Sequence, residues 1–253
     1  DEAFGYWGAA AHSLLLSAEQ NYNIAKKKDL VSADYDEDGV VDLKSEYVFA
    51  HAYYASSFDK GGKTSYMEDI TRAFLDGRKL ITSANGEKLT DAQRSELMRH
   101  VAIISENWQK VIAESVFKYA GSTYKSLVAL EDVNNDDLSK EFGKYMKYWG
   151  ELKGFSMALQ VGKDNIGESA TKLNRMIGFG PMLMDETQII GIDSKGNYIM
   201  DKIYSMNDAK LHMLKIQKLM IDEFGVEAKS NDMLAEMADL ASKIGTSESA
   251  END

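Results

Sequence analysis

The sequence contains no cysteine, and this absence excludes several kinds of chemistry at once. A chain without thiols forms no disulfide bond, and it has no thiolate to act as a nucleophile or to hold zinc or an iron–sulfur cluster. With 253 residues, the chain is nevertheless long enough to bury one large or two ordinary hydrophobic cores. The missing cysteine does not identify a compartment, because cytosolic proteins and disulfide-free bacterial envelope proteins both fit it.

Positive charge is also scarce. The 29 Lys and Arg residues are outnumbered by 41 Asp and Glu residues, which gives a formal net charge of −12. Nucleic acids and anionic membrane surfaces attract cationic proteins, so we expect neither as a partner. No apolar run approaches the roughly 20 residues that a membrane-spanning helix requires.

Recognisable catalytic motifs are missing as well. The four histidines form neither a His-Glu-x-x-His pattern nor a pair four residues apart, which argues against a protease-type zinc site. No G-x-S-x-G motif, phosphate-binding loop or dinucleotide fingerprint occurs. Gly178-Phe179-Gly180-Pro181 is too short and too apolar for a phosphate loop, and we interpret it as the end of a helix. His51 lies beside a Tyr-rich apolar face and is interpreted as a hydrogen-bonded residue rather than a metal ligand.

Helical periodicity dominates the sequence. Apolar residues recur at steps of three and four, which is the pattern of amphipathic helices that pack against one another. The expected helices cover residues 1–7, 43–58, 66–81, 90–119, 138–159, 213–224 and 234–244. Thr90 and Gln93 have capping-box spacing, and Gly225 is positioned to end a helix. The sequence therefore predicts an all-α fold.

One segment breaks the helical pattern. Residues 178–207 contain the only proline, and short apolar runs flank a Ser-Lys-Gly-Asn turn. These features predict a small β-hairpin or an ordered loop inserted between helices, with strand confined to about residues 189–199. The polar tail, residues 246–253, is expected to be disordered.

A calcium-binding pattern of the D-x-D-x-D-G type occurs once. Carboxylates occupy loop positions 1, 3, 5 and 9, which are Asp34, Asp36, Asp38 and Asp42. Gly39 at position 6 allows the sharp turn, and the backbone carbonyl of Val40 at position 7 is a further expected ligand. The alternative is an acidic, solvated turn, but closely spaced carboxylates repel one another unless a cation lies between them. The number of oxygen ligands favours calcium over magnesium, and their hardness favours it over zinc.

The loop departs from an EF-hand at position 12. Ser45 replaces the usual Glu there, and Glu46 follows one place later. Either Glu46 turns in toward the ion or water completes the coordination shell. We expect the ion to fix the start of the helix predicted over residues 43–58, because negative side chains also suit the positive end of a helix dipole.

Two distant segments share the pattern Glu-x-x-Gly-aromatic, and they begin at Glu2 and Glu151. The simpler interpretation is coincidence in a helical protein. The alternative is a duplicated bundle whose halves present equivalent carboxylates. In that case, Glu2 and Glu151 should lie on facing helices near the junction of the two halves.

Five segments, in this order along the chain, resemble a family of Gram-negative envelope lipoproteins of unknown function that is related to the imelysins. The segments are residues 1–6, 42–47, 73–78, 107–112 and 148–155. The resemblance implies an imelysin-like fold of two related helical bundles, which we expect over residues 1–130, with the calcium loop at 34–46, and over residues 131–245. It also implies export to the periplasm or outer membrane, a lipid anchor outside this chain, and a setting linked to iron acquisition.

The resemblance also suggests a second metal site. In imelysins, a Gly-x-His-x-x-Glu motif marks the presumed metal site, and Glu2 matches its Glu. The matching His would precede Asp1. Because the chain opens inside an expected helix, we expect natural residues upstream of Asp1. Glu151 occupies the equivalent position in the second half without a His. Iron or zinc is the candidate ion for this site between the halves.

Three functions are compatible with these patterns. The leading hypothesis is a non-enzymatic binding protein of the bacterial envelope that contains calcium and holds a metal ion, a metal complex or a small ligand between its halves. The first alternative is a metal-dependent, peptidase-like hydrolase that uses a His upstream of the chain. The second is a structural or interaction module that uses calcium only for stability.

Overall fold

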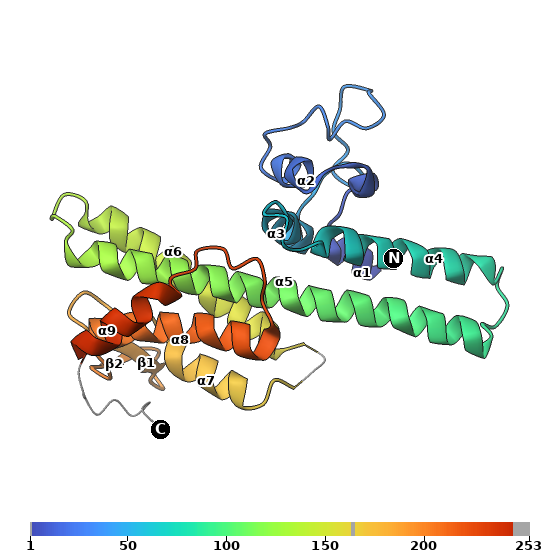
Figure 1. The fold of residues 1–253 in the computed structure, drawn as a ribbon. Helices are drawn as coiled ribbons and strands as arrows, with labels where there is room; N and C mark the ends of the chain where they lie inside the picture. The colour runs from blue at the N-terminus through green and yellow to red at the C-terminus, as the bar shows by residue number, and fades with distance from the viewer. Residues whose placement is uncertain (1, 163–164, 245–253) are drawn as a thin grey trace. The chain divides into compact units, whose positions relative to one another are not determined.

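The computed structural model describes residues 2–162 and 165–244, most of which are helical (Figure 1). The predicted all-α character is therefore confirmed, and the tail predicted to be disordered lies outside the described residues. The chain divides into two compact units, residues 1–111 and 112–253. The division falls within helix α5 (Asp91–Glu131), earlier than the expected boundary after residue 130. The relationship between two duplicated halves stays a prediction.

The first unit consists of short helices and the N-terminal part of α5. Its elements are α1 (Glu2–Trp7), the 3-10 turn η1 (Ser13–Leu15), α2 (Ala18–Ala25), α3 (Ala50–Asp59) and α4 (Tyr66–Ser83). Figure 1 shows α4 lying along the first part of α5, and a Cβ built on Gly77 of α4 meets Leu97 of α5 at 3.4 Å. Aromatic rings join these helices: the ring of Trp108 lies 5.3 Å from Trp7 and 6.4 Å from Phe74.

His51 of α3 belongs to this aromatic cluster. The Trp108 indole N–H donates a hydrogen bond to His51 Nδ1, so the histidine is neutral with its proton on Nε2. The interpretation of His51 as a hydrogen-bonded residue is confirmed. Burial lowers the pKa of His51 below its ordinary value of 6.5.

This lowered pKa predicts a loss of stability in mild acid. As the pH falls through 6.5, the unfolded chain binds a proton at His51 before the folded chain does, so the free energy of unfolding decreases until the folded-state pKa is reached. His51→Gln keeps an acceptor for Trp108 but does not titrate. Urea unfolding between about pH 7 and pH 5 should therefore show a steeper loss for the natural chain than for the variant. Parallel losses would contradict this role of His51.

The second unit contains the rest of α5 and all later elements. These are α6 (Leu138–Gln160), α7 (Glu168–Ile177), β1 (Gln188–Ile192), β2 (Tyr198–Asp201), α8 (Met206–Phe224), the 3-10 turn η2 (Leu234–Glu236) and α9 (Met237–Ile244). Its core is apolar, and the fully buried members include Phe117, Leu127, Leu152, Leu173, Leu214 and Ile216. Gly121 lets the segment after α8 pass close to α5, since an added Cβ would lie 2.0 Å from the carbonyl oxygen of Asn231.

Several local predictions are confirmed. The two strands pair antiparallel around the turn at residues 193–197, so the insertion is a β-hairpin. Thr90 and Gln93 exchange capping hydrogen bonds, and α8 ends at Gly225 in the left-handed conformation. The glycine at 178 ends α7. In the described part of the chain, no helix combines the length and the hydropathy needed to cross a membrane.

The helix predicted over residues 43–58 is wrong in its first seven residues. Helix α3 begins at Ala50, and Leu43 is 68% exposed. The backbone here is bonded to a distant segment: Ser45 O accepts the Ala11 N–H, and the Phe49 N–H donates to Gly8 O. These long-range bonds replace the i to i−4 bonds that a helix would need.

Candidate metal centre

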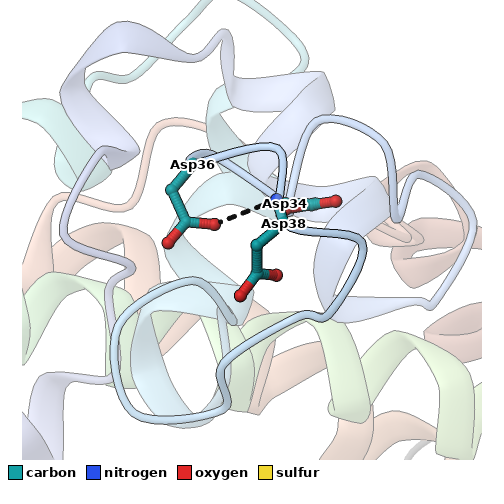
Figure 2. A group of neighbouring side chains, drawn as sticks. All are labelled: Asp34, Asp36 and Asp38. Carbon is teal, nitrogen blue, oxygen red and sulfur yellow. Dashed lines mark hydrogen bonds between the residues drawn. The ribbon is translucent and has the colours of Figure 1, made fainter.

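Asp34, Asp36 and Asp38 lie close together in a tight loop (Figure 2). One carboxylate oxygen from each lies within 4.8 Å of the others. Asp34 is half-buried, whereas Asp36 and Asp38 are exposed. The loop turns at Gly39, whose φ of +85° favours glycine over residues with a Cβ.

Hydrogen bonds within the loop orient these carboxylates. Asp34 accepts from the backbone N–H groups of Asp38 and Gly39, at 3.1 and 2.9 Å. Asp36 accepts from the same Asp38 N–H at 3.3 Å, and Asp38 accepts from the Val40 N–H at 2.8 Å. Each of these aspartates thus accepts hydrogen bonds from backbone N–H groups that follow it in the loop, and these bonds curve the backbone around the carboxylates. A cation bound here would meet three hard oxygen donors, which are the donors that calcium prefers.

Asp42 has a different local role. Its carboxylate accepts from the Lys44 N–H and from the Ser45 hydroxyl, each at 2.9 Å. The Lys44 hydrogen bond, followed by that of Ser45, lowers the pKa of Asp42. Among the described acidic side chains, Asp42 is outside the group formed by Asp34, Asp36 and Asp38. Position 9 of such loops often binds the ion through water, so the role of Asp42 stays a prediction, as does that of the exposed Val40.

Glu46 joins the two ends of the loop. Its side chain is only 6% exposed. One oxygen accepts from the N–H groups of Tyr35 and Asp36, at 2.9 and 3.3 Å, and the other accepts from the Asp42 N–H at 2.8 Å. The hydrogen bond from Asp42 is the largest of the effects that lower the pKa of Glu46, and burial opposes it. Both oxygens therefore face backbone N–H groups, so Glu46 holds the loop closed whether or not it also binds an ion.

His12 is a second support that sequence reasoning missed. It is buried, its ring stacks on Tyr35 at 4.8 Å, and its Nε2 lies 3.0 Å from Ser32 O, to which it donates. Tyr35 lies inside the loop, so His12 connects the loop to the chain after α1. The sequence gives no local signal for this contact, because the two rings belong to segments far apart in the chain.

An apolar hollow lies beside the loop. Its volume is about 1080 Å³. Its apolar lining residues are Leu30, Val31, Val41, Leu43, Tyr47 and Phe49. Asp34 belongs both to this lining and to the acidic group, so the loop forms one wall of the hollow. Val31 is 89% exposed, and Leu30, Leu43 and Phe49 of the same lining are exposed as well. A group of exposed apolar side chains of this kind often marks a binding site.

Glu2 and Glu151 lie in different units. Glu2 is exposed on α1, where the Tyr6 hydroxyl donates to it at 3.5 Å. Glu151 is half-buried on α6 and lines a shallow hollow with Lys147 and Phe155. Their expected positions on facing helices stay a prediction. Comparisons of the chain with protein-family models, with curated proteins and with solved structures found no match.

The geometry around Glu46 predicts that its removal opens the loop. Glu46→Ala leaves three backbone N–H groups without their acceptor, and water then reaches them. Hydrogen exchange at the amides of Tyr35 and Asp42 should become about tenfold faster. Glu37→Ala is the matched control, because Glu37 is an exposed acid in the same loop. Equal exchange rates in the two variants would show that Glu46 does not hold the loop closed.

Proposed function

We propose that the chain is a non-enzymatic binding protein in which one calcium ion orders the wall of an apolar binding hollow. The convergence of Asp34, Asp36 and Asp38 supports the proposal most directly. The sequence adds support, because it carries none of the catalytic motifs that would favour an enzyme.

The ion is held by the three converging carboxylates, by the Val40 carbonyl and, through water, by Asp42. A divalent cation there offsets the mutual repulsion of carboxylates whose oxygens lie within 4.8 Å of one another. Glu46 stabilises the closed loop, because both of its oxygens accept hydrogen bonds from backbone N–H groups of the loop.

The hollow is the proposed ligand site. Its lining comes from segments on both sides of the loop, with Leu30 and Val31 before it and Leu43 and Phe49 after it. Fixing the loop therefore fixes the spacing of these two segments. The lining favours an apolar ligand, and the side chains of Lys27 and Glu37 in the same lining could contact a polar group on that ligand.

The proposal also covers family and location. The five segments that resemble imelysin-related lipoproteins support an imelysin-like pair of helical halves, a place in the bacterial envelope and a link to metal acquisition. Under this wider proposal, Glu2 and Glu151 contribute to a second site for iron or zinc.

Calcium should stabilise the natural chain and not a variant that lacks the acidic group. At a hundredfold excess over the dissociation constant, one bound ion adds about 2.7 kcal/mol to the free energy of unfolding. A chelator should lower the melting temperature of the natural chain and leave Asp36→Ala, Asp38→Ala nearly unchanged. Asp132→Ala, Asp136→Ala is the control, since it removes two exposed aspartates elsewhere and should keep the chelator response. An equal response in all three proteins would contradict calcium binding at this loop.

Binding in the hollow should depend on both Leu43 and calcium. Leu43→Glu puts a charge into the lining without disturbing a core residue, because Leu43 is 68% exposed. We expect it to weaken the binding of an apolar fluorescent dye by about tenfold, the effect of losing one large apolar contact. A chelator should weaken dye binding by the natural chain as well. Val161→Glu, at a side chain that is 82% exposed in the second unit, should bind the dye normally. Equal dye binding by both variants would show that the hollow is not the ligand site. Dye binding that the chelator leaves unchanged would give calcium a structural role only.

A further inference from the structure

The second unit contains a hollow whose lining is mostly basic. The hollow has a volume of about 300 Å³ and lies between α7 and α8, which pack against each other (Figure 1). Each helix contributes two basic residues three positions apart, so the members of each pair are neighbours on one helix face. The described residues of the lining are Lys172, Arg175, Met176, Lys215, Lys218, Leu219 and Asp222. All of them belong to the second unit, so the hollow is separate from the calcium loop.

The charge of this lining is opposite to that of the chain. The lining contains four basic side chains and one acidic side chain, whereas the chain as a whole has a formal net charge of −12. Like charges on neighbouring positions of a helix repel each other, so the arrangement costs stability unless a negative charge offsets it. A hollow lined by charges of one sign also concentrates the field that attracts the opposite charge. The lining therefore favours an anionic ligand.

The one acid of the lining balances only part of the positive charge. The Asp222 carboxylate lies 2.6 Å from the Lys218 ammonium, one turn away on the same helix, and both side chains are about half-exposed. An exposed ion pair of this kind contributes little to stability, so it does not prevent Lys218 from contacting a second anion. In the described part of the chain, the Lys172 ammonium has no hydrogen-bond or ion-pair partner. Lys172 is exposed, and its flexible side chain can reach an anion in the hollow.

The lining also has an apolar part. Met176 and Leu219 are buried, whereas Lys172, Arg175 and Lys218 are exposed. Apolar surface therefore lies at the base of the hollow, and the charged groups lie around its rim. A ligand that fits both parts combines an anionic group with a small apolar body.

We propose that this hollow binds a small organic phosphate monoester. The phosphate oxygens accept hydrogen bonds from basic side chains of both helices, and the organic part lies against Met176 and Leu219. A phosphate monoester has three terminal oxygens and a charge of about −1.5 to −2, so it can contact several cations at once, whereas a carboxylate has two oxygens and one charge. A volume of about 300 Å³ equals that of about ten liquid water molecules, so the ligand has about ten heavy atoms.

Phenyl phosphate is the probe, and isothermal titration calorimetry at low ionic strength is the measurement. The full chain should bind phenyl phosphate saturably and should bind inorganic phosphate about tenfold more weakly, since inorganic phosphate lacks the apolar contact. Benzyl alcohol, which has the ring without the charge, should not bind. Lys172→Gln should weaken the binding of phenyl phosphate by about tenfold, the effect of one lost hydrogen bond between charged groups. It should not lower the free energy of unfolding, because it removes like-charge repulsion and no ion pair.

Lys140→Gln is the matched control, because Lys140 is an exposed lysine of α6 in the same unit and outside the lining. It removes the same charge, and its affinity for phenyl phosphate should equal that of the natural chain. Any of three outcomes would overturn the proposal: no saturable binding of phenyl phosphate, equal affinities in the two variants, or binding of inorganic phosphate or benzyl alcohol as strong as that of phenyl phosphate. None of these outcomes bears on calcium binding, which is tested at a loop in the other unit.

Discussion

The carboxylate of Glu46 holds together the part of the first unit on which both the acidic group and the hollow depend. It is buried, and it accepts backbone N–H groups from Tyr35 and Asp36 at one end of the loop and from Asp42 at the other. Hydrogen bonds to a charged acceptor are roughly twice as strong as neutral ones. The neighbouring Ser45 carbonyl ties this closed loop to the segment after α1. Neutral and charged hydrogen bonds therefore already order the backbone that carries the acidic group. A binding ion would have to order less of the chain, which lowers the cost of binding.

The acidic residues of the first unit occupy two kinds of surroundings, and these differ in what stabilises the negative charge. Asp36 and Asp38 are exposed, so water solvates them and the repulsion within the group is partly screened. Several solvated carboxylates suit a divalent ion that keeps part of its hydration shell. Asp59 is a single buried carboxylate that accepts hydrogen bonds from the Tyr66 and Met67 N–H groups and from the Thr64 hydroxyl. These donors and the positive end of the α4 dipole stabilise its charge without an ion.

Local patterns in the sequence predicted local structure well. The capping pair of Thr90 and Gln93 and the stop at Gly225 depend on neighbours within one helical turn, and both are present. The loop aspartates converge for the same reason, because their hydrogen bonds lie within the loop itself. The helix predicted from Leu43 failed because its backbone bonds to Gly8 and Ala11, which no periodicity reveals. The stacking of His12 and the basic hollow between α7 and α8 also join distant segments, so they required the structure.

The exposed apolar residues that flank the loop link its stability to the proposed binding function. Burying one large apolar side chain stabilises a protein by about 1.5–3 kcal/mol, so a chain gains by collapsing Val31 and Leu43 onto other apolar surface. A bound ion at a hundredfold excess contributes about 2.7 kcal/mol, which is a similar amount. If calcium occupies the loop as proposed, its binding energy is therefore large enough to hold the hollow open against collapse of one such side chain. Glu46 and the hydrogen bond from the Tyr47 hydroxyl to the Ala25 carbonyl oxygen also join the segments before and after the loop, so calcium would strengthen a connection that the chain already has.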